Sequence, residues 1–262
     1  MSRVIVFGDV HGCSTQLDQL LEKLQPQEGD RLVFLGDLID KGPDSPGVVR
    51  RVRELSTEFP LTLIQGNHEE MFLRWHKKDT EEGKQSMKRH AEFEALSKKL
   101  SKEDVKFLGS SVLYERFNVN GRDFIAVHAG IPASVPELPE KEEDVAKLSS
   151  KARRRVQLVL RVRYQTPEGK FVKLGSETEE DVFWTETYDG RFGTALYGHQ
   201  PYMDNTGPKQ EKHSLGLDTG CVFGGSLTAL SLVEKEGKVG KPSDLKWGLV
   251  SVPGEEHCKA FF

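Results

Sequence analysis

The sequence predicts an α/β fold, in which helices pack against a sheet of buried strands. Several short runs of Val, Ile, Leu and Phe are continuously apolar, as strands buried on both faces usually are. The segments between the first three runs instead repeat apolar residues at helical spacing. A chain that alternates strand, helix, strand, helix and strand in this way is typical of a sheet covered by helices.

Five apolar runs are predicted to be strands, and each ends in glycine together with a polar or ionisable residue. They are "VIVFGD" (4–9), "RLVFLGD" (31–37), "LTLIQGN" (61–67), "FIAVHAG" (124–130) and "TALYGH" (194–199). Two helices are predicted between the first three strands. "STQLDQLLEKL" (14–24) opens with a Ser/Thr cap, and "PGVVRRVRELSTE" (46–58) has proline in its first turn.

The rest of the chain divides into a charged helical interval, an insertion and a final pair of strands. Residues 70–110 are predicted to be helical, and residues 137–180 to form a small cap over the edge of the sheet. The cap ends in "RVRYQTPEGKFVKLG", which predicts a hairpin turning at Glu168 and Gly169. "LTALSLVEKEGKVGKPSDLKWGLVSVP" (227–253) predicts antiparallel strands. We expect a single domain over residues 1–262 with a cap-like insertion at approximately 137–180.

The composition indicates a globular protein of a reducing compartment. The 262 residues carry a net charge of −4, which gives no reason to expect stable nucleic-acid binding through a basic face. The run "KARRR" (151–155) is typical of a solvated helix face, with a polyanion site as the alternative. The three cysteines show no C-x-x-C spacing, and no apolar run approaches the roughly 18 residues of a membrane span. We therefore expect a cytoplasmic protein without membrane contact.

The ends of the five predicted strands collect the residues that could carry chemistry. Sites in open α/β sheets form outside the carboxyl ends of the strands, so these side chains are expected to converge. Any one of them alone is more often part of a turn or of the core. Together they offer carboxylates, imidazoles and an amide oxygen, a set that suits two divalent ions such as Mn, Fe or Zn. The set comprises Asp9, His11, Asp37, Asp40, Asn67, His68, His128 and His199.

The motifs that hold these residues resemble the signature series of calcineurin-like metallophosphoesterases. The matching stretches are "GDVHG" (8–12), "GDLIDKG" (36–42), "GNHE" (66–69), "HAG" (128–130) and "YGH" (197–199). Within that family the chain resembles the phosphoprotein-phosphatase branch, which includes the ApaH-like symmetric bis(5'-nucleosyl)-tetraphosphatases. "GLDTGCVFGGSLTAL" (216–230) is more similar to this nucleotidase subgroup than to protein phosphatases. The resemblance implies an αββα sandwich of two mixed sheets flanked by helices.

The resemblance also implies a role for each residue of the set. Asp9 and His11 would hold the first metal, Asp37 would bridge two ions, and the second ion would be completed by Asn67, His128 and His199. A bridging water of lowered pKa would attack phosphorus in line. His68 would be the general acid, and Asp40 would orient its imidazole. Manganese is the expected metal, with Fe, Zn, Co or Mg as alternatives.

The second motif departs from the family pattern, which reads G-D-x-x-D-R-G, because Lys41 stands in place of the arginine. A lysine offers a point charge on a flexible stem instead of a planar fork. We expect Lys41 to bind substrate phosphate, with a solvated turn as the alternative. Arg191, Arg161 and Arg163 are further candidates for phosphate contacts, each with an ordinary surface role as the alternative. Asp218 is expected either to support the metal ligands from behind or to lie in a turn.

The expected function is a metal-dependent hydrolase of a small nucleotide polyphosphate. We favour symmetric cleavage of diadenosine tetraphosphate to two ADP. The alternative is a serine/threonine or broad-specificity phosphatase, and RNA ends or inorganic polyphosphate are weaker candidates. A non-catalytic binding module is disfavoured, because such a protein would be free to lose the ligand set and His68.

Overall fold

The computed structural model describes residues 2–135, 137–203, 207–233 and 246–258. The first of its sheets has the strand order β13-β12-β1-β2-β3. Strands β1, β2 and β3 run parallel, whereas β12 pairs antiparallel with β1 and β13 pairs antiparallel with β12. Their bounds are β1 Arg3–Phe7, β2 Arg31–Phe34, β3 Leu61–Leu63, β12 Ser226–Val233 and β13 Lys246–Pro253.

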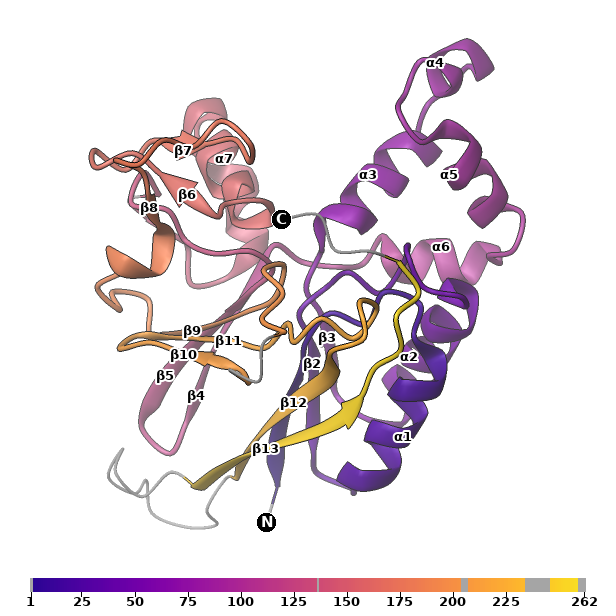
Figure 1. Ribbon diagram of the computed structural model, residues 1–262, viewed down its shortest axis with the longest axis horizontal. Coiled ribbons are helices and arrows are strands. Elements are labelled where there is room, and N and C mark those ends of the chain that lie inside the picture. The colour runs from indigo at the N-terminus through magenta and orange to yellow at the C-terminus, as the bar shows by residue number, and fades with distance from the viewer. Residues whose placement is uncertain (1, 136, 204–206, 234–245, 259–262) are drawn as a thin grey trace.

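Helices cover the outer face of this first sheet (Figure 1). Helix α1 (Ser14–Leu24) buries Leu17, Leu20, Leu21 and Leu24 on one side, and α2 (Ser45–Glu58) buries its valines in the same core. The interval 70–110 is helical, as the sequence predicted. It contains α3 Asn67–His76, α4 Glu81–Gln85, α5 His90–Ser97 and α6 Lys102–Leu108.

A second mixed sheet lies against the inner face of the first. Its strand order is β10-β11-β9-β5-β4, with β5, β9 and β11 parallel to one another. The layer between the two sheets contains Val6 and Leu35 from the first sheet and Ala126 and Leu196 from the second, all buried. The bounds are β4 Tyr114–Val119, β5 Arg122–Val127, β9 Thr194–Tyr197, β10 Lys209–Gln210 and β11 Ser214–Gly216.

The chain between β5 and β9 covers the outer face of the second sheet. It forms a small antiparallel sheet of order β7-β6-β8 and short helices, and a core around Trp184 and Val159 joins them to β5 and β9. The four layers therefore make the αββα sandwich that the resemblance implied. The elements are η1 Glu142–Lys147, α7 Ser150–Val156, η2 Gln157–Leu160, β6 Tyr164–Gln165, β7 Phe171–Val172, β8 Val182–Phe183 and η3 Trp184–Glu186.

Several local predictions can be compared with these elements. The hairpin predicted at Glu168 and Gly169 is confirmed, since β6 and β7 pair antiparallel around that turn. The Ser/Thr cap predicted for the first helix is wrong, because Cys13 is the N-cap residue of α1 and its side chain makes no cap hydrogen bond. The final strands pair antiparallel as predicted, although residues 234–245 between them lie outside the described part of the chain. That residues 137–180 act as a cap stays a prediction, and the small sheet extends past them to β8.

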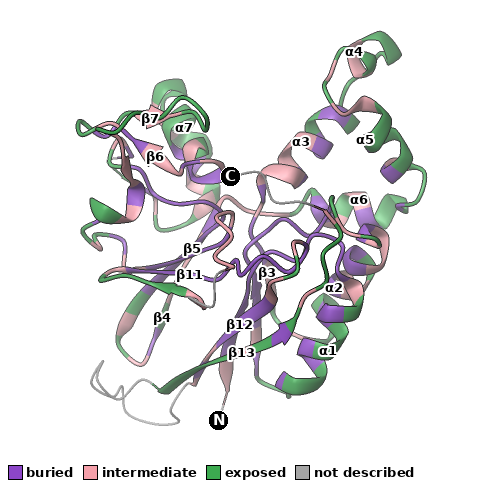
Figure 2. Cartoon of the chain, in the orientation of Figure 1, coloured by how far each residue is buried: buried purple, intermediate pink, exposed green. Residues whose placement is uncertain are grey.

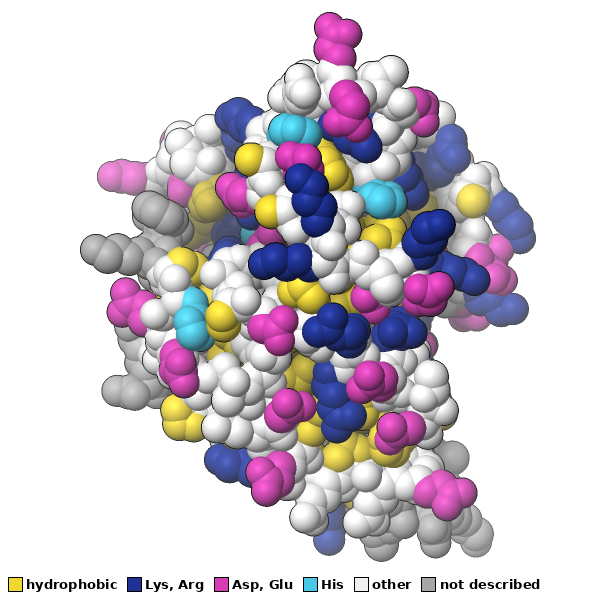
Figure 3. All heavy atoms as spheres, turned by 90° about the vertical axis from the view of Figure 1, so that its right-hand side faces the viewer, with side chains coloured by type: hydrophobic (Ala, Val, Ile, Leu, Met, Phe, Trp, Pro, Cys, Tyr) yellow, Lys and Arg dark blue, Asp and Glu magenta, His cyan; other side chains and the backbone are white. Residues whose placement is uncertain are grey.

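The surface of the molecule is mixed in charge. Figure 2 shows buried strands inside and exposed residues along β13 and the outer sides of the helices. On the face seen in Figure 3, Lys and Arg side chains alternate with Asp and Glu, so this face has no continuous field of one sign. Within the described residues, no helix combines the length and the apolar character that crossing a membrane requires.

Candidate functional site

The loops after β1 and β2 build the first half of the site. Their backbones lie together, because His11 N donates to Asp37 O at 2.8 Å and Gly12 N donates to Leu38 O at 2.8 Å. Gly42 permits this close approach, since a Cβ there would collide with the carbonyl oxygen of His11. The loops thereby place Asp9, His11, Asp37 and Asp40 at one end of the sheet.

The buried carboxylate of Glu69 binds the backbone of the loop that follows β2. It accepts hydrogen bonds from the backbone N–H groups of Asp37 at 2.7 Å, of Leu38 at 2.9 Å and of Gly66 at 3.0 Å. Burial, followed by the nearby charge of Asp37, raises the pKa of Glu69 to about 7. Glu69 lies in the first turn of α3, so this helix fixes the conformation of the loop that carries Asp37.

The second half of the site comes from α3 and from the second sheet. Asn67 and His68 begin α3, His128 follows β5, and His199 follows β9. His128 is fully buried, and its Nδ1 donates to the carbonyl oxygen of Leu35 at 2.8 Å. Because a carbonyl can only accept, this contact fixes the tautomer and turns Nε2 toward the site. His11 is held in the same way by the carbonyl oxygen of Ile39 at 2.9 Å.

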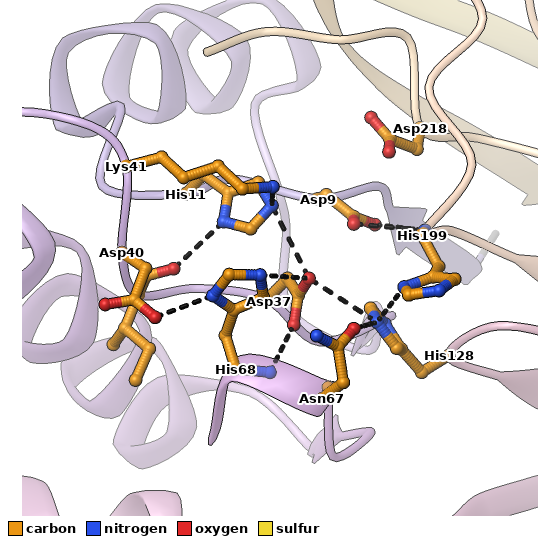
Figure 4. Close-up of polar contacts among 12 residues, drawn as sticks. Asp9, His11, Asp37, Asp40, Lys41, Asn67, His68, His128, His199 and Asp218 are labelled. Carbon is orange, nitrogen blue, oxygen red and sulfur yellow. Dashed lines mark hydrogen bonds and ion pairs between the residues drawn. The ribbon is translucent and has the colours of Figure 1, made fainter. Parts of the chain in front are cut away.

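Asp37 lies at the centre of these side chains (Figure 4). Its Oδ2 is 3.4 Å from His11 Nε2, 3.5 Å from His128 Nε2 and 3.8 Å from His68 Nε2. Burial alone would raise the pKa of Asp37, but the surrounding imidazoles, His128 first, hold it well below its usual range. The carboxylate is therefore ionised and shared between the two sides of the site.

The donor atoms form two groups that share Asp37. One contains His11, Asp37 and His68, and the other contains Asp37, His128 and His199, with the ligand atoms of each group within 4.8 Å of one another. Asp9 belongs to neither group in this structure, because its carboxylate accepts the backbone N–H of His199 at 3.0 Å. A carboxylate shared by two groups with imidazole donors on either side suits a pair of divalent cations.

The electrostatics of the site also favour bound cations. Three carboxylates are buried together, and burial with the charges of Asp218 and Asp37 raises the pKa of Asp9 well above its usual range. Burial, with Arg163 next, lowers the pKa of His199 well below its ordinary value, so its ring is neutral and keeps a lone pair. His199 Nε2 is buried and has no hydrogen-bond partner among the described residues. These residues fit divalent metal ions.

Asn67 also reaches this second group. Its side-chain oxygen lies 2.9 Å from His128 Nε2, and His199 Nδ1 lies 3.2 Å from the same nitrogen. Burial alone would lower the pKa of His128, but the charge and hydrogen bond of Asp37, together with the hydrogen bond to Leu35 and the charge of Glu69, outweigh burial and raise it. Three of the side chains expected around the second metal, Asn67, His128 and His199, are thus brought together by the fold.

His68 and Asp40 form a pair beside the first group. His68 Nδ1 lies 2.6 Å from Asp40 Oδ2. Burial raises the pKa of Asp40, but the contacts with His68 and then Arg89 outweigh it and leave the pKa lowered. Because the carboxylate can only accept, Nδ1 of His68 carries a proton and Nε2 faces the centre of the site.

Arg89 completes this pair and was missed by the sequence analysis. Its Nη1 donates to Asp40 Oδ2 at 2.8 Å and lies 3.3 Å from His68 Nδ1, while its other nitrogens bind Glu92. Arg89 is the N-cap residue of α5, 49 positions along the chain from Asp40. It lies in a charged helical interval without any motif, so no local pattern indicated that it would reach the site.

The expected phosphate-binding cations divide into two that reach the site and two that do not. Lys41 Nζ lies 2.7 Å from His11 Nε2 and lines the adjoining cavity, as does Arg163, which donates to the carbonyl oxygen of His199 at 2.7 Å. Arg191 does not line this cavity and binds Asp189 and the carbonyl oxygen of Val135, so its contact with phosphate stays a prediction. Arg161 is instead engaged by Glu70 at 2.6 Å.

Asp218 is buried at the edge of the site and lines the same cavity. Its Oδ1 accepts the backbone N–H of Gly220 at 3.0 Å, as in a turn. Burial raises its pKa, and the charge of Asp37 adds to this effect. The two expectations for Asp218, a turn and a supporting position near the ligands, are therefore compatible.

Comparison with known proteins connects this geometry to a family. The family model described as calcineurin-like phosphoesterase matches residues 2–203. The chain is 32% identical to the asymmetrical bis(5'-nucleosyl)-tetraphosphatase PrpE of Oceanobacillus iheyensis, over 89% of this chain and 90% of that one. It is 30% identical to the protein of the same name from Bacillus subtilis, over 92% of this chain and 95% of the other.

Solved structures agree with the fold. One, provisionally assigned by its description as a diadenosine tetraphosphatase, has a TM-score of 0.67 at 26% identity and covers 97% of this chain and 94% of its own. A serine/threonine phosphatase from Saccharomyces cerevisiae has a TM-score of 0.60 at 15% identity, over 95% of this chain and 79% of its own, which shows a shared fold alone. The PrpE relatives are named asymmetrical, so the expectation of symmetric cleavage is not supported and needs correction.

Proposed function

This chain belongs to the calcineurin-like phosphoesterase family, and from that premise we propose that it hydrolyses diadenosine tetraphosphate asymmetrically, to ATP and AMP. The observation that carries the proposal is the pair of donor groups sharing Asp37 beside a cavity lined by cations. The names of relatives that align along about nine-tenths of both chains support the substrate and the asymmetry. The same grounds support the nucleotide polyphosphate, the substrate favoured from the sequence, over the phosphoprotein alternative.

The metals would be held by the residues that the fold gathers around Asp37. His11 and Asp37 would hold one ion, with Asp9 nearby, and Asn67, His128 and His199 would hold the other together with Asp37. When bound, the ions supply positive charge that polarises the phosphoryl group and acidifies the attacking water. Mixed oxygen and nitrogen donors suit manganese, iron and zinc alike, and the flexible stem of Lys41 lets its ammonium leave His11 Nε2 when a cation takes that nitrogen.

The chain itself supplies the proton for the leaving group. Asp40 holds His68 through Nδ1, so that Nε2 of the imidazole points into the site and can donate to the departing oxygen. Asp40 is fixed in turn by a hydrogen bond from Arg89 and by its own backbone N–H, which donates to Ser45 Oγ at 2.9 Å. Proton donation from Nε2 accelerates hydrolysis most when the leaving group is strongly basic and departs slowly as an anion.

Lys41 and Arg163 supply the positive charge that a bound phosphate needs. Both line the cavity that adjoins the site, where charge–charge attraction is stronger than in bulk water. Arg163 is oriented by Gln200 Oε1 at 2.8 Å and by the carbonyl oxygen of His199, so its fork is fixed before substrate binds. Lys41 is more adaptable, which suits a chain of phosphates that must move through the site.

The test is a product analysis with manganese present. The chain is incubated with diadenosine tetraphosphate, and the nucleotides are separated by ion-exchange chromatography. We expect ATP and AMP in equal amounts from the intact protein and about a hundredfold lower rate from His68→Ala. His76→Ala is the matched control, since His76 lies at the exposed end of α3, and its rate should equal that of the intact protein.

Other outcomes would overturn the proposal in distinguishable ways. Two ADP as the only product would restore symmetric cleavage and reject asymmetry. No dinucleotide cleavage, but rapid release of phosphate from a phosphopeptide, would favour the protein-phosphatase alternative. Full activity of His68→Ala would reject His68 as the proton donor while leaving the substrate intact.

A further inference from the structure

A cavity of about 580 Å³ adjoins the site, and its lining includes two kinds of side chain. We call the cations Lys41, Arg89 and Arg163 the cationic wall, and the apolar side chains Tyr164, Leu174 and Phe223 the apolar wall. We propose that the apolar wall binds the nucleoside attached to the phosphate under attack. This subsite rests on the proposed function and explains why cleavage would be asymmetrical.

One member of the apolar wall, Leu174, belongs to none of the hydrophobic clusters of the described residues. The Leu174 side chain is 51% exposed, the highest value among the large hydrophobic side chains that the structure describes as exposed. It lies two residues past Val172, the residue of β7 that pairs with Tyr164 of β6. A large apolar side chain left in water at the wall of a cavity is a common feature of ligand sites.

The two aromatic rings of the wall are held in place. The Tyr164 ring packs edge-to-face on Phe183, with centroids 5.8 Å apart. The Phe223 ring has Lys41 Nζ 5.0 Å from its centroid, which links the apolar wall to the cationic one. A planar heterocycle can stack on such rings whatever its identity, because every nucleobase has a π-face. The wall therefore suits a purine and does not by itself select adenine.

The position of the cavity decides which phosphate reaches the site. His199 and Asp218 line the cavity and also lie at the site around Asp37, so a ligand in the cavity lies directly beside that site. The volume falls in the range of pockets that take one drug-sized ligand, the size class of a single nucleotide. The second half of a dinucleotide would then extend away from the cavity.

This arrangement presents the α-phosphate for hydrolysis. With the nucleoside in the adjoining cavity, the phosphorus nearest the site is the one bonded to that nucleoside. The oxygen of water forms a bond to this phosphorus and gives up a proton to solvent, and the bond to the oxygen that bridges the α- and β-phosphates breaks. That oxygen keeps the electron pair and takes a proton from His68, so AMP and ATP are released. Attack one phosphate further along would release two ADP.

The experiment measures AMP binding and dinucleotide hydrolysis in matched variants. Leu174→Ala and Tyr164→Ala remove parts of the wall, and Tyr164→Phe keeps the ring. Leu249→Ala is the control, since Leu249 is a 39% exposed leucine on β13 that does not line the cavity. By titration calorimetry we expect AMP to bind about tenfold more weakly to both alanine variants and unchanged to Tyr164→Phe and Leu249→Ala. The affinity for inorganic phosphate should be the same in all five proteins.

Kinetics separate the subsite from the proposed function. We expect the KM for diadenosine tetraphosphate to rise about tenfold in the alanine variants, while that for inorganic tripolyphosphate stays constant. If the dinucleotide is cleaved but neither KM nor AMP affinity changes, the subsite is wrong and the function stands. If no dinucleotide is cleaved yet AMP binding weakens only in the wall variants, the function is wrong and the nucleoside subsite stands. Failure of the intact protein to bind AMP overturns the subsite.

Discussion

Backbone strain at single residues is concentrated around the site. Eight described residues other than glycine have positive φ, and six of them belong to the site or to its cavity: His11, Asp37, Asp40, Lys41, Arg89 and His199. Such conformations cost about 1–3 kcal/mol each and persist only where the surrounding structure enforces them. The hydrogen bonds of Glu69 to the Asp37 loop provide one such constraint. Favourable contacts in the rest of the fold thus offset the cost of the backbone conformations that orient these side chains toward the site.

Arg89 gives the first prediction at this scale. Arg89→Met removes the hydrogen bond to Asp40 Oδ2, so the Asp40–His68 pair loses one of its fixed partners. We expect kcat to fall about tenfold on phenyl phosphate and much less on p-nitrophenyl phosphate, whose leaving group needs little help from an acid. Arg89→Lys, which keeps the charge, should recover part of the loss.

The control for Arg89 is Arg74→Met, which removes an exposed arginine of α3 that is paired only loosely with Glu70 at 3.7 Å. Its rates should match those of the intact protein on both esters. A loss of equal size on the two esters for Arg89→Met would contradict positioning of the acid and would point to a general structural or charge effect.

Individual residues differ in how far the sequence could predict them. His128 and His199 were predictable because each follows a buried strand directly, and strand ends share an edge. Arg89 was not, because its contact with Asp40 spans 49 positions and depends on the path of α4 and α5. For Arg191, nearness in sequence to His199 does not give its position, because its guanidinium binds Asp189 and the carbonyl oxygen of Val135 instead of lining the cavity.

Among the elements, α3 has the largest part in the site, because its first turn performs three tasks. Asn67 faces His128, His68 faces Asp40, and Glu69 fastens the Asp37 loop. The backbone N–H of His68 also donates to Asp37 Oδ1 at 3.0 Å, so the amino end of the helix meets a carboxylate. The long buried strands were predictable from continuous apolar runs. The ends of the two-residue strands β6, β7 and β8 could not be predicted from apolar runs, because these strands are defined only by their pairing with one another.

Helix α6 gives a prediction about stability. Asp104 and Ser101 form a reciprocal cap at its start, and Arg53 of α2 donates to Asp104 Oδ1 at 2.9 Å. Burial raises the pKa of Asp104, but the hydrogen bonds from Ser101 and Arg53 outweigh it, so the pKa is lowered in the folded state. We expect Asp104→Asn to lower the free energy of unfolding at pH 7 by about 1–2 kcal/mol, measured by urea denaturation.

The pH dependence of this difference has a definite sign. A carboxylate whose folded pKa is depressed contributes stability above its unfolded pKa of about 3.9 and loses it as the pH falls through the folded pKa. The two proteins should therefore become more alike as the pH is lowered below about 4. Asp18→Asn, at a 65% exposed carboxylate of α1, is the control and should cost little at any pH. A constant difference across the pH range would contradict the role of the charge.

At the scale of the whole molecule, the site exists only where the two sheets meet. His11 and Asp37 follow strands of the first sheet, and His128 and His199 follow strands of the second. The alternation of strands and helices predicted the first sheet, and the motif order implied the second. The cavity could not be predicted, because Arg89, Arg163 and Leu174 come from segments that only the complete fold places around one space.

Because ligands come from both sheets, bound metal should hold the sheets together and stabilise the whole fold. A ligand that binds only the folded state at a hundred times its Kd adds about 2.7 kcal/mol. For a chain of this size that corresponds to a rise in Tm of about 5–10 °C, which differential scanning calorimetry with manganese would detect without any assay of activity. A chelator should reverse the rise. Asp37→Asn, which weakens the carboxylate shared by both donor groups, should abolish it, whereas Asp79→Asn, at an exposed position after α3, should preserve it. An equal rise in Asp37→Asn would place the metal elsewhere.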